Sequence, residues 1–191
     1  DVHMRIKDFA DKLMPHMSQR IRLHEGHTPL FHSFGIEPEV EKLYQPRVEI
    51  GNGAYIVVEQ TEALVSIDVN SGKFKPGTDL EETAYRTNLQ AIPEIVRQLR
   101  LRDIGGIIVV DCIDMVLESN RDLVLRRLVE CLGRDRTRHQ VAEVTSLGLV
   151  QMTRKRIGTG LLEAFSQPCD HCHGRGVVVH ELPVEPKRGD D

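Results

Sequence analysis

The sequence contains no tryptophan, and aromatic residues make up only 4% of it. A hydrophobic core must therefore be built mainly from Val, Ile and Leu side chains. No apolar run reaches the roughly 20 residues that a membrane-spanning helix needs, and the first residues, DVHMRIKDFADKL, lack the apolar segment of a signal peptide. These absences argue against a membrane-spanning or secreted protein, and we expect a cytoplasmic one.

The sequence also has few cysteines and no excess of positive charge. In a reducing compartment the four cysteines are expected to be thiols or metal ligands and not disulfides. The net charge of −4 does not suggest a strongly basic nucleic-acid binder. The chain opens without Met inside an amphipathic helical pattern, which suggests a fragment, and its tail, ELPVEPKRGDD, has the composition of a linker.

The middle of the chain has the pattern of a β-meander. The runs RVEI, AYIVVEQ and EALVSIDVN are separated by short turns, the first of them Gly51-Asn52-Gly53. The third run is apolar from Ala63 almost to Asp68, so it predicts a strand buried on both faces.

Two helices and further strands follow. Thr78 with Glu81 predicts a capping box at the start of a long helix, and Ser119 with Asp122 predicts the start of another. Between them GIIVVD predicts a buried strand. HQVAEVTS predicts a further strand, and LVQMTRKR fits a strand or a helix. This order indicates a mixed sheet flanked by helices, an α+β or α/β fold.

Carboxylates end two of the apolar strands. Asp68 closes LVSIDVN and Asp111 closes GIIVVD, and a carboxylate after a buried run costs desolvation energy unless something pairs with it. If the strands are parallel neighbours, both aspartates lie at one edge of the sheet beside Asn70. Such oxygen ligands suit Mg²⁺. The alternative is two aspartates that cap loops or pair with arginines.

Long stretches of the sequence resemble one family. The runs TEALVSIDVNSGK, EETAYRTNLQAIPEIVRQLRLRDIGGIIVVDCIDM and RDRTRHQVAEVTSLGLVQMTRKR, followed by C-x-x-C-x-G-x-G, are similar to the RNase E/G family of bacterial endoribonucleases. The resemblance runs from about residue 5 to residue 180. The run LGLVQMTRKRIGTGLLEAF resembles an actinobacterial-type member.

The resemblance implies a division into segments. Residues 1–47 would be the end of an RNase H-like region, 48–165 a DNase I-like catalytic subdomain, 166–180 a zinc-link and 181–191 a tail.

The resemblance also implies site residues. Asp68 and Asp111 match the family's magnesium-binding aspartates, and Asn70 matches the asparagine that supports them. Arg138 matches an arginine that helps to hold the 5′ end of the RNA substrate. The implied reaction is Mg²⁺-dependent cleavage of single-stranded, A/U-rich RNA to 5′-phosphate and 3′-hydroxyl ends, in RNA processing and mRNA decay.

Two other functions remain open. The family's OB-fold RNA-binding domain and its 5′-sensor domain have no counterpart in the sequence, so the chain by itself could be a zinc-linked dimerisation core with little activity. A third interpretation is a metal-dependent phosphoesterase that acts on other nucleic acids.

The motif CDHCHGRG, residues 169 to 176, can be interpreted in three ways: a haem attachment site, a redox pair or half of a zinc site. Haem attachment requires export, and a redox pair normally opens a helix, so we favour zinc. Zinc needs four ligands. They could come from histidines of the same chain (His171, His173 or His180). We favour Cys169 and Cys172 from each of two chains, which makes a symmetric Cys₄ site in a homodimer, as in the family.

Overall fold

The computed structural model describes residues 1–75, 79–172, 174 and 176. Its internal contacts form two units, Asp1–Tyr44 and Gln45–Asp191. The first unit contains the helices α1 (Val2–Leu13), α2 (Pro15–Ser18), α3 (Leu30–Ser33) and α4 (Glu37–Lys42). The second unit carries the candidate site.

A six-stranded mixed sheet forms the frame of the second unit, in the order β1-β2-β3-β4-β6-β5. Only the β3–β4 pair is parallel among the strand pairs of the described residues. The strands are β1 (Arg47–Gly51), β2 (Ala54–Gln60), β3 (Leu64–Asn70), β4 (Gly106–Asp111), β5 (His139–Val144) and β6 (Leu149–Arg154). The sequence LVQMTRKR, which fitted either class of element, contains the whole of β6.

The meander predicted from the sequence is confirmed. β1 pairs with β2 and β2 with β3, both antiparallel. All three residues of the turn Gly51-Asn52-Gly53 have positive φ angles, between 57° and 98°. Glycine tolerates such angles and asparagine adopts them more readily than most residues, which explains why this short sequence reverses the chain.

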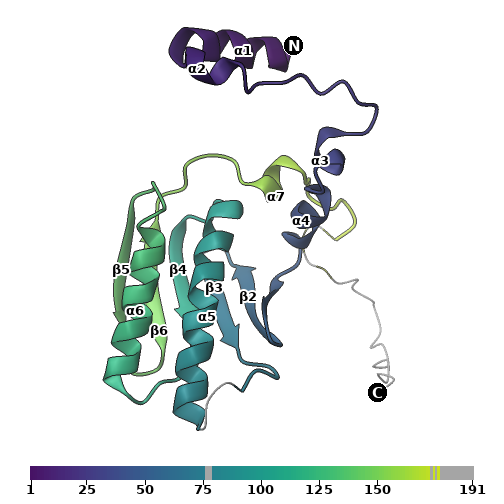
Figure 1. Ribbon diagram of the computed structural model, residues 1–191. Coiled ribbons are helices and arrows are strands. Elements are labelled where there is room, and N and C mark those ends of the chain that lie inside the picture. Colours follow the sequence, from purple (N-terminus) through teal and green to yellow (C-terminus); the bar gives the residue numbers. More distant parts are fainter. Residues whose placement is uncertain (76–78, 173, 175, 177–191) are drawn as a thin grey trace. The chain divides into compact units, whose positions relative to one another are not determined.

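Two helices cover one face of the sheet: α5 (Leu80–Leu101) and α6 (Glu118–Leu132) (Figure 1). The core between helices and sheet is aliphatic, as the lack of aromatics predicted. Its fully buried large side chains are Ile56, Ile67, Ile92, Ile95, Leu99, Ile108, Val110, Met115, Val124, Leu128, Leu132 and Met152. A short helix, α7 (Leu161–Ala164), follows the sheet. The overall class is α+β, which confirms the predicted mixed sheet with flanking helices.

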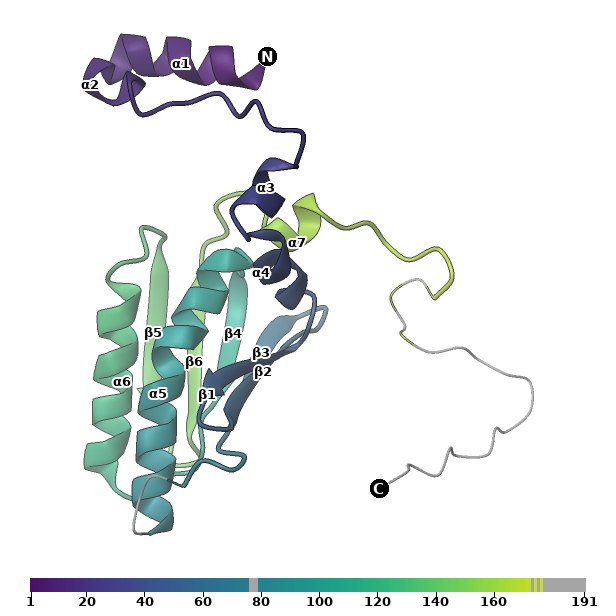
Figure 2. The same cartoon turned by 45° about the vertical axis from the view of Figure 1, so that its right-hand side comes forward.

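The prediction that β3 is buried on both faces is wrong. Its residues alternate in burial: Val65, Ile67 and Val69 pack into the core, while Asp68 on the other face is exposed. Figure 2 shows α5 and α6 on the same side of the sheet, and among the described residues of the second unit no helix covers the opposite side. We call the side opposite the two helices the open face. An apolar run alone does not distinguish one buried face from two.

Both predicted capping boxes are wrong as well. The N-cap of α5 is Asp79, whose side chain accepts a hydrogen bond from the backbone N–H of Glu82, and Thr78 lies outside the described residues. α6 begins at Glu118 after Leu117, without a side-chain cap. Glu81, assigned to the first box, instead bonds to a distant loop.

Helices of the described residues are either short or polar. None of them contains an apolar stretch long enough to cross a lipid bilayer.

Candidate active site

Asp68 and Asp111 lie side by side at the ends of two parallel strands. β3 and β4 run in the same direction, and the register pairs Asp68 directly with Asp111. Val110 and Cys112, on either side of Asp111, are buried, so its side chain is on the open face with that of Asp68. The sequence made this juxtaposition conditional on the two strands being neighbours, and the register meets the condition.

Asn70 fixes the orientation of one of these carboxylates. It follows Asp68 by two residues and therefore lies on the same face of β3. Its side-chain nitrogen donates a hydrogen bond of 2.6 Å to Oδ2 of Asp68. This bond satisfies one carboxylate oxygen and leaves the other available for a ligand. The structure therefore brings together three of the residues singled out in the sequence.

The electrostatics of this edge favour a cation. Burial raises the pKa of Asp111, and the nearby negative charges of Asp68 and Asp114 raise it further. The folded chain thus holds Asp111 among like charges, which makes its charged form less favourable than in water. A bound cation would remove that disadvantage.

The oxygen donors of this edge fit a magnesium ion. Mg²⁺ typically uses one or two protein carboxylates and keeps its other positions for water and phosphate oxygens. Asp68 and Asp111 supply two carboxylates that face solvent on the open face. In the described part of the chain there is no group of three or more His, Cys, Asp and Glu side chains arranged around a common metal position. The donor set is therefore that of a partly hydrated, substrate-accessible ion, and an enclosed metal cage does not fit it.

A second feature of the open face is a basic depression. Arg138 and Lys155 lie in the lining of a shallow hollow of about 630 Å³, together with Gln140 and Thr153. The backbone N–H of Lys155 donates to the carbonyl of Arg138, which places the two residues opposite each other on neighbouring segments of the same chain. Two cations beside exposed polar side chains are suited to contacts with phosphate.

The depression and the aspartate pair lie at opposite ends of the sheet. Gly106, at the start of β4, pairs with Arg154, while Asp111 at its end pairs with Leu149. Five residue steps along a strand correspond to about 17 Å. Arg138 is therefore not part of the aspartate centre, and any RNA that contacts both must run along the open face.

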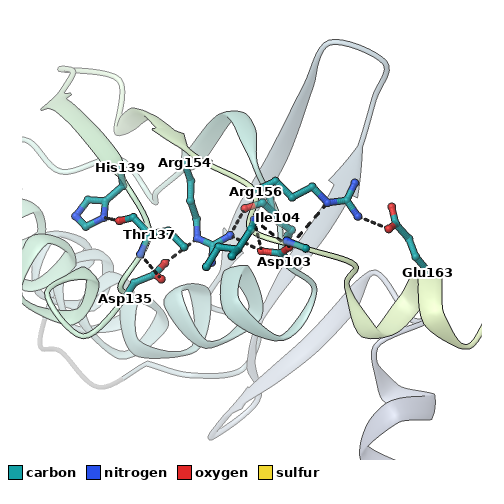
Figure 3. Close-up of polar contacts among 10 residues, drawn as sticks. Asp103, Ile104, Asp135, Thr137, His139, Arg154, Arg156 and Glu163 are labelled. Carbon is teal, nitrogen blue, oxygen red and sulfur yellow. Dashed lines mark hydrogen bonds and ion pairs between the residues drawn. The ribbon is translucent and has the colours of Figure 1, made fainter. Parts of the chain in front are cut away.

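A buried ion cluster supports the rim of the depression (Figure 3). Arg154 points into the core, where its side chain is 2% exposed. Its Nε donates to Asp135 at 2.7 Å, and its Nη1 donates to Asp103 at 3.1 Å and to the carbonyl of Ile104 at 2.6 Å. Asp135 lies just before Arg138 in the chain. The cluster thus joins the segments on both sides of the hollow.

The same cluster fixes the chain where it leaves the sheet. Asp103 also accepts hydrogen bonds from the backbone N–H groups of Ile157 and Gly158, the latter at 2.8 Å. Burial alone would raise the pKa of Asp103, but the bonds from Gly158, Arg154 and Ile157 outweigh it, and the pKa is lowered. The pKa of Asp135 is lowered in the same way: the bonds from Arg154 and Thr137 outweigh burial.

The four cysteines differ in burial. Cys131 is half-buried. Cys112 is buried, and burial raises the pKa of its thiol to about 12, an effect that Asp111 strengthens. Such a thiol is not ionised at neutral pH and is a packing residue. Cys169 is exposed and Cys172 is half-buried, and neither is in a disulfide. Of the candidate histidines, His171 is exposed, and His173 and His180 lie outside the described residues.

Comparison with known proteins gives the family. The sequence pattern of the Ribonuclease E/G family matches residues 1–157. The chain belongs to this family. The match includes Asp68, Asn70, Asp111 and Arg138 and ends before Cys169 and Cys172.

Individual relatives agree with this assignment. Ribonuclease G of Haemophilus influenzae is 41% identical over 173 residues, which are 91% of this chain and 35% of that protein. Ribonuclease E of Escherichia coli is 43% identical over 164 residues, 86% of this chain and 16% of that protein. A chloroplastic ribonuclease E/G-like protein of Arabidopsis thaliana is 43% identical over 175 residues, 91% of this chain and 18% of that protein. This family member is therefore homologous to RNase G and RNase E endoribonucleases and spans about a third of their length or less.

Sequence reasoning missed several residues of the site. Asp114 follows Asp111 in a D-x-x-D pattern too common to single it out, and its role emerges from its charge near Asp111. The cluster of Arg154 with Asp103 and Asp135 left no local signal, because its members are 51 and 19 residues apart.

Proposed function

We propose that the natural protein containing this chain is an Mg²⁺-dependent endoribonuclease that cleaves single-stranded, A/U-rich RNA to 5′-phosphate and 3′-hydroxyl ends, in RNA processing and mRNA decay. The observation that carries the proposal is the pairing of Asp68 with Asp111 at adjacent strand ends in a member of this family. We also infer an actinobacterial-type RNase E, on the resemblance of residues 147–165.

Asp68 and Asp111 would hold the Mg²⁺ ion, which when bound supplies an activated water and positive charge beside the scissile phosphate. Asn70 keeps Asp68 in a fixed rotamer through its 2.6 Å hydrogen bond. Arg138 with Lys155 binds a distant phosphate of the same strand, at the substrate's 5′ side. This contact orients the RNA along the open face, and positioning of this kind lowers the entropic part of the barrier.

The rest of the assembly follows from the same resemblance. Residues 48–165 form a DNase I-like catalytic subdomain, residues 1–47 the end of an RNase H-like region, 166–180 a zinc-link and 181–191 a tail. Cys169 and Cys172 of two chains share one Zn²⁺ in a homodimer, with a tetramer as the next level in the full-length protein. The expected location is the cytoplasm.

A second candidate function is an inactive, zinc-linked dimerisation core. The net charge of −4 favours it, because affinity for RNA depends strongly on phosphate contacts by Lys and Arg. Incubation of this chain with a 5′-monophosphorylated A/U-rich oligonucleotide and Mg²⁺ separates the two ideas. Robust turnover eliminates the inactive core, whereas the absence of turnover by this chain supports it. An RNA-against-DNA competition in the same assay tests the phosphoesterase alternative.

Substitution of the paired aspartates tests the proposed chemistry. In the natural protein, Asp68→Asn and Asp111→Asn should each lower the cleavage rate by at least about a thousandfold while RNA binding stays within a few-fold. Asp122→Asn is the matched control, because this exposed aspartate on α6 undergoes the same change of charge. Cleavage by either site variant at the rate of the control would refute the proposal.

A further inference from the structure

The segment that follows Asp111 has no regular structure, yet its backbone is held at almost every residue. Residues 112–117 connect β4 to α6 outside any helix or strand. Buried backbone groups in such a segment need hydrogen-bond partners from elsewhere. The turn between β5 and β6 supplies the first of these partners: the carbonyl of Gly148 accepts a hydrogen bond from the N–H of Cys112 at 3.2 Å.

Asn88 of α5 holds the next residue at two points. Its side-chain oxygen accepts from the backbone N–H of Ile113 at 2.9 Å, and its side-chain nitrogen donates to the carbonyl of the same residue at 2.8 Å. Asn88 is fully buried. Both bonds reach a residue only two positions beyond Asp111, and they fix that residue in both translation and rotation.

Glu81, two turns earlier on α5, holds the far end of the segment. Its carboxylate accepts from the backbone N–H of Val116 at 2.7 Å, from that of Leu117 at 3.1 Å and from the side chain of Asn120 at 2.6 Å. Burial alone would raise the pKa of Glu81, but these three bonds and the charge of Arg121 outweigh it, and the pKa is lowered.

Other buried polar residues of α5 behave differently. The hydroxyl of Thr87 donates to the carbonyl of Thr83, one turn earlier in the helix. Gln98 bonds to Glu94 and Arg102, also one turn away. These bonds stay within α5 and its C-terminal cap, whereas those of Asn88 and Glu81 leave the helix for the segment behind Asp111.

We propose that Asn88 and Glu81 are positioning residues of the reaction: they hold residues 112–117 so that Asp111 and Asp114 keep a fixed place relative to Asp68. The inference rests on the proposed function. Two carboxylates can share one cation only at a set separation, and the repulsion among the three aspartates tends to drive them apart. Groups that hold metal ligands in place typically alter metal affinity or activity by about 10–100-fold when removed.

Kinetics of Asn88→Leu in the natural protein test the proposal. Leu has the same number of side-chain heavy atoms as Asn, branched at the same carbon, and makes neither bond to Ile113. We expect kcat to fall and the Mg²⁺ concentration for half-maximal rate to rise, each on the order of tenfold or more, while KM for the oligonucleotide changes less than twofold. Asn88→Asp, which keeps the acceptor for the Ile113 N–H and loses the donor at neutral pH, should fall between Asn88→Leu and the natural protein.

Thr87→Val is the matched control. It removes a buried hydrogen bond one residue away on α5 without touching residues 112–117, so it should lower the melting temperature and leave kcat and the Mg²⁺ requirement unchanged. A purely structural role for Asn88 predicts the same pattern for Asn88→Leu, and that result would overturn the proposal. If Asn88→Leu does not fold, Glu81→Gln decides: an unaltered kcat and Mg²⁺ requirement in a folded variant overturns the proposal equally.

Failure of this inference can be told from failure of the proposed function. If Asp111→Asn cleaves like the natural protein, the proposed function is wrong and the positioning role of Asn88 falls with it. If Asp111→Asn is inactive and Asn88→Leu is normal, the metal centre stands and only the positioning role is lost.

Discussion

The negative charge of Asp111 destabilises the fold, because it lies near two other carboxylates, and the same arrangement favours the binding of a cation. The pKa of Asp111 is raised by burial and by the charges of Asp68 and Asp114. A carboxylate whose folded pKa lies above its unfolded pKa lowers stability as pH rises through that interval, and the loss is complete once the pH is well above the folded pKa. Residues of functional sites often carry such a cost.

This charge cluster gives a residue-scale prediction. In a chelator at pH 7, Asp111→Asn should raise the melting temperature by a few degrees, because it removes one of three repelling charges. Addition of Mg²⁺ should then stabilise the unsubstituted chain and not the variant. Differential scanning calorimetry with and without Mg²⁺ measures both. A lower melting temperature for the variant in chelator would contradict the repulsion.

Gly148 is a second residue on which the site depends. Its φ angle is +77°, and a Cβ atom added there would lie 2.5 Å from the carbonyl oxygen of Cys112. A left-handed backbone costs a residue with a side chain roughly 1–2 kcal/mol, and the clash adds to this. Gly148→Ala should therefore lower the free energy of unfolding by more than about 2 kcal/mol, as measured in urea.

Gly158→Ala is the control for that substitution. A Cβ atom at Gly158 would meet nothing within 4 Å, and its backbone is not in the left-handed region. The free energy of unfolding of Gly158→Ala should stay within about 0.5 kcal/mol of that of the unsubstituted chain. Equal effects at both glycines would show that the approach of Gly148 to Cys112 is unimportant.

At the scale of elements, the buried cluster of Arg154, Asp103 and Asp135 ties β6 to the loops at one end of the sheet. The side chains of Asp103 and Asp135 are 13% and 4% exposed. Loss of the only partner of a buried charge typically costs about 3–5 kcal/mol. In Asp135→Asn the charge of Arg154 remains paired with Asp103, so the loss of stability should be smaller than this range. The variant should weaken RNA binding through Arg138, whereas the Mg²⁺ requirement should remain.

The lowered pKa values of these aspartates predict acid sensitivity. A group with a depressed folded pKa contributes its stability above the unfolded pKa, near 3.9 for aspartate, and loses it as pH falls through the folded pKa. Stability should therefore decline below about pH 4. Asp103→Asn should flatten this decline, and urea unfolding at several pH values measures it. An unchanged slope would contradict the role of Asp103.

Sequence patterns predicted elements better than their ends and contacts. The strands that end at Asp68 and Asp111 were recognised because β-branched runs are a local signal. The capping boxes failed because Glu81 uses its carboxylate on Val116 and Leu117, 35 and 36 residues away, where a local pattern has no information. Asn88 was missed for the same reason. Asp68, Asn70 and Asp111 were predictable from the sequence, whereas Asp114 and the long-range bonds of Glu81 and Asn88 were not.

For the whole molecule, the motif CDHCHGRG remains the basis of a prediction about assembly. If Cys169 and Cys172 of two chains share a zinc ion, native mass spectrometry should find a dimer with one zinc per two chains, and Cys169→Ser should yield monomers without zinc. Completion of the site by histidines of one chain predicts instead one zinc per monomer. Either result decides between the two interpretations of the motif.

The central claim is that Asp68 and Asp111 together hold a divalent cation on the open face. Titration calorimetry of this chain with Mn²⁺, a substitute for Mg²⁺, measures that binding without any dependence on RNA. The account predicts one site per chain on protein that carries zinc but no other metal ion. This site should be lost in both Asp68→Asn and Asp111→Asn and retained in Asp122→Asn. Equal binding by all four proteins would contradict it.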